Sequence, residues 1–143
     1  MEITADNPCP CRALDADQAS DADQASYAQC CQPFHEHRAS GQVLPATAEQ
    51  LMRSRYSAFV LGLADYLLQS WHETTRPAEL LLDEDLHWEG LDIVKTRSGG
   101  AQASRGVVEF TAHYSQDGQR GSQHEVSTFV RENGAWFYLD ALY

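Results

Sequence analysis

All four cysteines of the chain lie in one N-terminal segment, at a spacing that could support metal chemistry. They form a Cys-Pro-Cys run and an adjacent pair further along the chain. Four thiolates can supply the tetrahedral sulfur set that zinc accepts. Two disulfides are one alternative, and reduced thiols without a ligand role are another. The pattern favours a single zinc ion, with these ligands: Cys9, Cys11, Cys30 and Cys31.

The start of the chain bears on these alternatives. Met1 is followed by acidic and polar residues, without the apolar run of a secretory signal. We therefore expect a cytoplasmic location, where thiols stay reduced and metal binding is favoured over disulfides.

Further candidate ligands surround the cysteines. His35 and His37 closely follow the second pair and could replace a cysteine ligand. Between the pairs, the acidic hexapeptide Asp-Ala-Asp-Gln-Ala-Ser occurs twice in succession over residues 15–26. Its lack of large apolar side chains predicts a flexible surface loop. Calcium binding there is a weaker alternative, because the turn glycine and distal glutamate of a calcium loop are missing.

Composition narrows the range of functions. At 143 residues, the chain is long enough for one globular domain with a small appendage. A formal charge of −11 argues against nucleic-acid binding through bulk electrostatics. Apolar residues make up 43% of the chain, and no stretch approaches the length of a membrane span.

Helical signals follow the cysteine segment. Residues 45–71 carry the strongest one, with Thr47 placed to cap the first turn. Gly62 weakens the helix near its end, and a second short helix is expected to begin over residues 65–68. Residues 77–82 predict the start of a third helix, because Pro77 suits a first-turn position. One apolar stripe at helical spacing comprises Met52, Tyr56, Phe59, Val60 and Leu63.

The periodicity changes to strands in the second half. Asp117-Gly118 and Asn133-Gly134 are strong hairpin signals. Helices first and an antiparallel meander afterwards predict an α+β fold, with helices covering one face of a twisted sheet. The expected strands are Leu86–Thr96, Arg105–Ser115, Ser122–Arg131 and Trp136–Leu142.

The strand register divides the side chains between two faces of the sheet. One face combines aromatic residues with carboxylates, which is typical of a pocket under a helical lid. The other face is β-branched and could serve as a partner surface. With even-numbered hairpin loops, the first face carries Val108, Phe110, Ala112, Tyr114, Glu125, Ser127, Phe129, Trp136, Tyr138 and Asp140.

Several blocks of the sequence carry a resemblance to a known family. They are Met-Arg-Ser-Arg-Tyr-Ser-Ala-Phe-Val at residues 52–60, residues 64–67, Trp71-His72, Trp88 to Leu91, residues 108–110 and residues 129–140. This set resembles the YchJ-type family of small bacterial proteins. The resemblance implies a cone similar to nuclear transport factor 2, in which a bent antiparallel sheet and helices enclose a cavity.

The cysteine segment is similar to the SEC-C motif, which is a zinc knuckle. That similarity implies that the four cysteines are zinc ligands, although residues 12–26 replace the glycine-rich turn that the motif usually has. Two units are therefore expected: a SEC-C-like knuckle with an acidic insert over residues 1–46, and the cone over residues 47–143.

The expected pocket leaves several roles open. Arg55 could bind an anion inside the cavity or form a buried pair with a glutamate. Glu125 and Asp140 could pair with Arg55 or lie at the rim. His72 could transfer protons together with one of these carboxylates, or hydrogen-bond in the core. The candidate pocket residues are Arg55, Tyr56, Trp71, His72, Glu125, Tyr138 and Asp140.

These features predict a cytoplasmic binding or adaptor protein with a zinc knuckle, a ligand-sized cavity and a protein partner. The alternative is a small-molecule enzyme, an isomerase or hydrolase, that uses His72 with a carboxylate inside the cone. A homodimer joined through the β-branched sheet face is a third possibility. The sequence contains no nucleophile elbow, phosphate-binding loop, dinucleotide fingerprint or zinc-protease motif.

Overall fold

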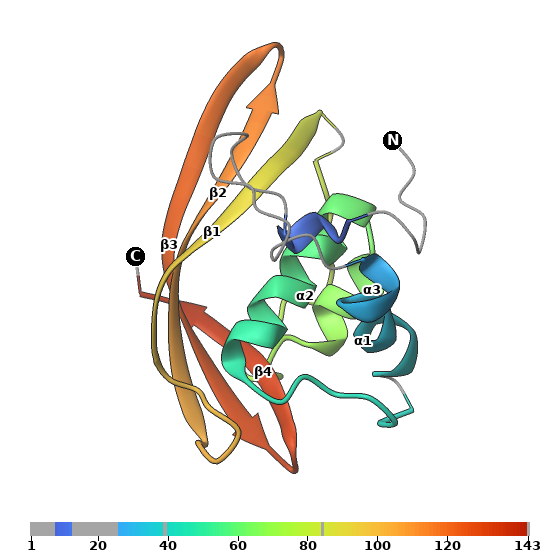
Figure 1. Cartoon of the computed structure of the whole chain (residues 1–143), viewed down its shortest axis with the longest axis vertical. Helices are drawn as coiled ribbons and strands as arrows, with labels where there is room; N and C mark the ends of the chain where they lie inside the picture. The colour runs from blue at the N-terminus through green and yellow to red at the C-terminus, as the bar shows by residue number, and fades with distance from the viewer. Residues whose placement is uncertain (1–7, 13–25, 39, 84, 143) are drawn as a thin grey trace.

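Helices cover one face of a curved antiparallel sheet in the computed structural model, which describes residues 8–12, 26–38, 40–83 and 85–142 (Figure 1). The predicted α+β class is confirmed. Residues 15–25 of the acidic repeat lie outside the described residues.

The 3-10 turns are η1 (Pro10–Arg12) and η3 (Tyr27–Gln29), and the helices are α1 (Gln32–His37), α2 (Ala48–Leu61) and α3 (Ala64–Gln69). The strands are β1 (Leu86–Ser98), β2 (Arg105–Gln116), β3 (Gln119–Glu132) and β4 (Ala135–Ala141), paired in chain order.

Local sequence signals set the ends of α2. The Thr47 hydroxyl accepts a hydrogen bond from the Gln50 amide at 3.1 Å, which confirms the predicted cap. Gly62 ends the helix with a φ of 74°, a left-handed conformation that glycine adopts without steric cost. Helix α3 then starts at Ala64, close to the predicted second helix.

The helix predicted from Pro77 is wrong, because residues 77–82 are irregular. Leu80 and Leu82 both pack against the apolar cluster around Leu67, whereas Leu81 between them is 83% exposed. This alternation has a period of two, and a helix would not place both leucines on one face.

Both predicted hairpins are confirmed. Asp117 and Gly118 have φ values of 53° and 79°, and Asn133 and Gly134 have values of 54° and 81°. Two successive residues with positive φ are typical of a tight turn whose twist matches the flanking strands. Strands β2 and β3 therefore pair directly up to the turn, with Gln116 opposite Gln119.

The register confirms most of the predicted inner face and corrects one residue. Val108 lies opposite Ser127 and Phe110 lies opposite Glu125, as expected. A β-bulge then interrupts the pairing of β3 with β4, so that Thr128 lies opposite Asp140. One extra residue in a strand reverses which face the following side chains take. Asp140 is therefore exposed, and its assignment to the inner face was wrong.

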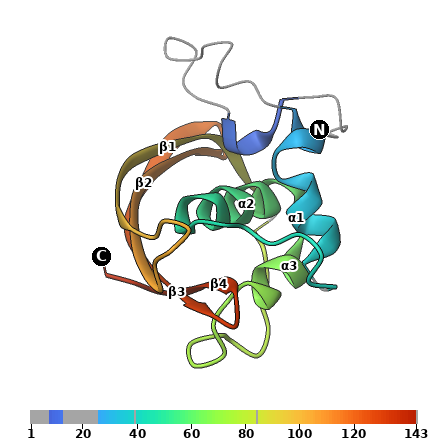
Figure 2. The same cartoon turned by 60° about the horizontal axis from the view of Figure 1, so that its bottom comes forward.

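Helix α2 lies inside the curve of the sheet, as Figure 2 shows. Leu51 of α2, Val108 of β2 and Trp136 of β4 are completely buried in one apolar cluster. The same cluster includes Cys11 and Cys31. The cysteine segment and the sheet thus share one core, with α2 between them.

The start of α2 touches the sheet at two glycines, which generates a testable prediction. A Cβ on Gly106 would lie 2.7 Å from the Gly99 Cα and 2.9 Å from the Ala48 Cβ. We expect Gly106→Ala to lower the free energy of unfolding by about 1–3 kcal/mol in urea denaturation, because backbone must shift. Gly100→Ala is the matched control, since its Cβ would meet no atom within 4 Å. Equal effects of the two substitutions would contradict this account.

Candidate functional site

The four cysteine sulfurs converge, and all four lie within 4.8 Å of one another. The Sγ–Sγ distances are 3.5 Å from Cys11 to Cys30, 3.7 Å from Cys11 to Cys31 and 3.9 Å from Cys30 to Cys31. A regular zinc–thiolate tetrahedron has edges of about 3.8 Å, since Zn–S bonds are about 2.3 Å long. None of the four cysteines forms a disulfide, so the disulfide alternative is wrong. This donor set fits zinc.

Short turns bring the two cysteine pairs together. Cys11 lies in η1, while Cys30 and Cys31 lie between η3 and α1. An isolated antiparallel bridge between Pro8 and Ser26 joins the two halves of the knuckle. Cys9, Cys11 and Cys31 are at most 1% exposed, whereas Cys30 is half-buried.

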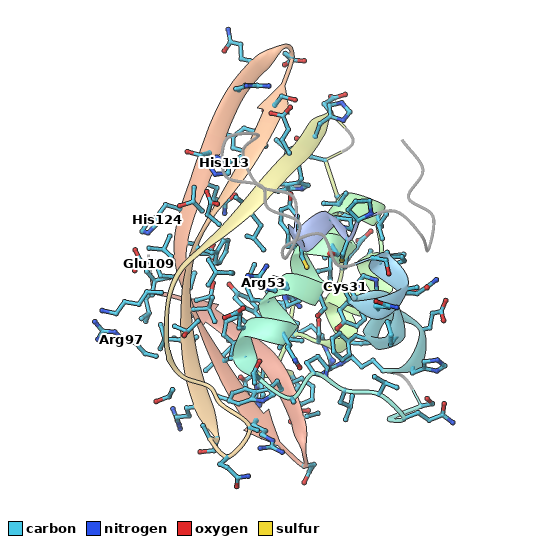
Figure 3. All side chains as sticks on the ribbon, in the orientation of Figure 1. Cys31, Arg53, Arg97, Glu109, His113 and His124 are labelled. Atoms are coloured by element: carbon cyan, nitrogen blue, oxygen red, sulfur yellow. The ribbon has the colours of Figure 1, made fainter. Side chains whose placement is uncertain are left out.

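Helix α2 supplies the outer contacts of this cluster. The buried Ser57 hydroxyl donates to the Cys31 Sγ at 3.3 Å and lies 3.4 Å from the Cys9 Sγ. Arg53 donates from Nη1 to the Cys11 carbonyl oxygen at 2.9 Å and also pairs with Glu49. Figure 3 shows Cys31 and Arg53 in the helical part of the molecule. Sequence reasoning missed the roles of Ser57 and Arg53, although both residues belong to the family-like block at 52–60.

The thiols influence each other's ionisation. Hydrogen bonding, chiefly from Cys11, lowers the pKa of Cys9 to about 7. Contact with Cys30 raises the pKa of Cys11, and contact with Cys11 raises the pKa of Cys31. One thiolate therefore forms readily, and further thiolates in so small a buried volume require a cation to offset their charge.

The two histidines near the cysteines do not replace a ligand, and that prediction was wrong. Neither His35 nor His37 belongs to the group of converging donors. The His35 ring donates from Nε2 to the Ser54 carbonyl oxygen at 2.8 Å and accepts at Nδ1 from the Tyr27 hydroxyl at 2.6 Å. Burial lowers the pKa of His35. Both ring nitrogens are thus occupied, with Nε2 joining α1 to α2 and Nδ1 joining α1 to η3.

A second candidate site is a cavity of about 270 Å³ between α2 and the concave face of the sheet. It brings together five predicted pocket residues, namely Arg55, Tyr56, Trp71, Glu125 and Tyr138. The remaining lining residues are Met52, Phe59, Trp88, Phe110, Ala112, Gln123 and Ser127. The walls are therefore mostly aromatic, with a few polar groups.

Arg55 is the buried cation of this cavity, and its side chain is 4% exposed. It donates from Nη1 to the Leu67 carbonyl oxygen and to the Ser70 hydroxyl, both at 2.7 Å. Its guanidinium carbon lies 5.2 Å from the Trp71 ring centre and 4.7 Å from that of Tyr138. Within the described part of the chain, no carboxylate lies within ion-pairing distance of it, so the expected Arg–Glu pair is not formed. Burial lowers the pKa of Arg55 to about 10, which leaves it charged at neutral pH.

His72 lies outside the cavity, and its predicted pairing with Glu125 or Asp140 is wrong. The segment around it runs beside β4, where the His72 amide donates to the Tyr138 carbonyl oxygen at 2.8 Å. Successive residues of an extended segment point to opposite sides. Trp71 therefore contacts the Tyr138 ring, whereas His72 contacts the Phe137 ring and places Nε2 2.8 Å from a Glu132 oxygen.

The convex face of the sheet carries contacts between histidines and carboxylates, interspersed among its β-branched residues. His113 lies 2.7 Å from Asp92, and His124 lies 2.7 Å from Glu109. Figure 3 shows His124, Glu109 and Arg97 on the side of the sheet that faces away from the helices. A homodimer through this face stays a prediction.

Comparison with known proteins places the chain in a family. The model of the YchJ middle domain, which is similar to nuclear transport factor 2, matches residues 47–141. The chain belongs to the YchJ family. It is 46% identical to a UPF0225 protein of Streptomyces coelicolor, with 93% of each chain covered. It is 44% identical to a UPF0225 protein of Xanthomonas campestris, with 96% of each chain covered.

Solved structures agree with this membership. A SEC-C motif containing protein from Psychrobacter arcticus is 31% identical, with a TM-score of 0.76, and the match covers 93% of this chain and 80% of that one. A SEC-C motif containing protein from Rhodopseudomonas palustris is 28% identical, with a TM-score of 0.68, and covers 82% and 91%. Among the described residues, no helix has the length and apolar character needed to cross a membrane.

The buried tyrosines predict a loss of stability at alkaline pH. Burial raises the pKa of Tyr27 and Tyr56, and raises that of Tyr138 to about 12. Their contribution to stability is complete below the ordinary phenol pKa of about 10 and is lost as pH rises towards 12. Burial also raises the pKa of Tyr66, and the lowered pKa values of Arg55 and Arg38 act in the opposite direction, as two groups against four.

We therefore expect the free energy of unfolding in urea to fall between about pH 9 and pH 12, and to fall less in Tyr138→Phe. A Tyr138→Phe variant with the same pH dependence as the parent chain would contradict the assignment to this side chain.

Proposed function

We propose that the chain is a zinc-binding protein whose knuckle has a structural role and whose cone binds a small ligand. The observation that carries the zinc assignment is the convergence of four cysteine sulfurs, none in a disulfide, at tetrahedral spacing. The similarity to solved SEC-C motif containing proteins supports it. Free thiols also suit a reducing compartment, which supports the proposed cytoplasmic location.

The surroundings of the cysteines support a structural role for zinc. Four cysteine ligands leave no open coordination position, and catalytic zinc sites need one. Bound zinc would supply the positive charge that several neighbouring thiolates require. Because Cys11 and Cys31 belong to the same apolar cluster as α2, metal binding there stabilises the helix that forms one wall of the cavity.

The cavity supports ligand binding better than the proposed His–carboxylate chemistry. None of the described residues that line it is a histidine, and His72 pairs with Glu132 instead. A protein partner remains part of the proposal. The exposed residues Ala28 and Gln29, next to the half-buried Cys30, offer such a partner the outer surface of the knuckle.

Zinc binding can be measured directly on the purified chain. We expect about one zinc ion per chain by elemental analysis, and an intense tetrahedral thiolate spectrum after replacement by cobalt. Cys11→Ser should lose most of the metal and unfold at a lower temperature, because metal binding and folding are coupled. His37→Asn is the control and should keep the metal, since His37 is not among the converging donors. Metal far below one ion per chain would overturn the proposal.

The contact from α2 to the thiols gives a separate prediction. Ser57→Ala removes the hydrogen bond to the Cys31 sulfur, so we expect zinc affinity to fall about 10- to 100-fold in competition with a chelator. Ser54→Ala is the matched control. Ser54 is equally buried, but its hydroxyl bonds to the Leu51 carbonyl and the Tyr66 hydroxyl. The same loss of affinity in both variants would show a general loss of stability rather than a contact with the ligand.

A further inference from the structure

We propose that the cavity binds a small aromatic monocarboxylate, with the carboxylate held by Arg55 and the ring between the aromatic walls. This inference rests on the proposed ligand-binding role of the cone and names the chemistry of the ligand. Three features of the cavity carry it.

The first feature is a buried cation with spare donors. Every hydrogen bond that Arg55 makes within the described residues comes from Nη1, which leaves Nε and Nη2 without an acceptor there. A buried, charged guanidinium without a paired anion is costly, and its planar fork matches a carboxylate. An anionic ligand in the cavity would therefore gain a charge-assisted contact that the protein itself does not satisfy.

The second feature is the aromatic cover of this cation. The Arg55 guanidinium carbon lies 5.2 Å from the Trp71 ring centre, and both residues line the cavity. The Trp71 Nε1 is buried without a hydrogen-bond partner, so it presents no donor to the cavity. The donors that this wall offers to an anion therefore belong to Arg55, whose guanidinium the Trp71 and Tyr138 rings hold in place.

The third feature is the shape and polarity of the remaining wall. The Tyr56 ring packs edge to face on Trp88, with the ring centres 6.1 Å apart. The Phe59 ring packs on Trp88 at a tilt, with the ring centres 6.2 Å apart. These rings line the cavity and favour a flat apolar body. Its volume of about 270 Å³ lies near the lower end of the range for ligand pockets, which suits a ligand with a single ring.

Glu125 adds a selectivity element. It lines the same cavity and accepts hydrogen bonds from Ser127 and Gln123. A carboxylate at this position repels a second negative charge and accepts a hydrogen bond from a ring hydroxyl. The cavity should therefore prefer monoanions to dianions.

Isothermal titration calorimetry on the full, zinc-analysed chain tests this assignment, with benzoate, 4-hydroxybenzoate, benzamide and terephthalate as probes. We expect benzoate to bind with a Kd of about 1 mM or tighter, and neutral benzamide to bind at least about tenfold more weakly. Terephthalate should also bind more weakly than benzoate. The fluorescence of Trp71 and Trp88, which line the cavity, should change on saturation.

Two variants separate the contributions. Arg55→Lys keeps the charge but loses the fork, so benzoate should weaken about tenfold while benzamide is unchanged. Glu125→Gln should reduce the preference for benzoate over terephthalate, measured as the ratio of the two Kd values. If Arg55→Lys fails to fold, two measurements still test the proposal. They are the comparison of benzoate with benzamide on the parent chain and the binding of terephthalate to Glu125→Gln.

The outcomes also separate this inference from the proposed function. Equal affinity for benzoate and benzamide overturns the anion assignment and leaves a ligand-binding cavity. No binding of any probe overturns the inference together with the ligand-binding role of the cone. The zinc content of the same sample tests the knuckle independently in either case.

Discussion

The burial of α2 between the cysteine knuckle and the concave sheet is the constraint on which the rest of the structure depends. Leu51, Ser54, Ser57 and Ala58 of this helix are completely buried. The helix contacts the thiols through Ser57 on one side and forms a wall of the cavity through Arg55 on another. Few elements cover so small a core, so each depends on the same helix. The four-cysteine cluster and the cavity therefore both pack against α2.

Sequence signals that act over a few residues predicted the fold well. The Thr47 cap, the Gly62 helix end and both Asp-Gly and Asn-Gly hairpins depend on local backbone chemistry. Features that depend on pairing between distant segments were missed. The β4 bulge at Leu139 and the alignment of the His72 segment with β4 leave no local signature. They decided which of the predicted pocket residues reach the cavity.

The candidate site also combines features that residue type and spacing predict with features that depend on contacts between distant segments. The convergence of the four cysteines follows from their residue type and spacing, and five pocket candidates meet on one cavity. Whether Arg55 pairs with a glutamate depends on ångström-scale distances between α2 and β3, which composition cannot provide. The roles of Arg53 and Ser57 likewise depend on the rotation of α2 about its axis. Sequence reasoning could name this block as characteristic of a family without assigning a partner to each residue.

The order of contacts along α2 limits how this chain can change in length. Arg53 bonds to the backbone of the cysteine segment, the Ser54 carbonyl to His35, Arg55 to the end of α3 and Ser57 to the thiols. Each added residue turns a helix by about 100° and advances it by about 1.5 Å. An insertion or deletion within this segment would therefore misplace, all at once, every contact made by the residues on the N-terminal or the C-terminal side of the change. Substitutions can be absorbed one contact at a time, whereas the spacing of these residues behaves as a single unit.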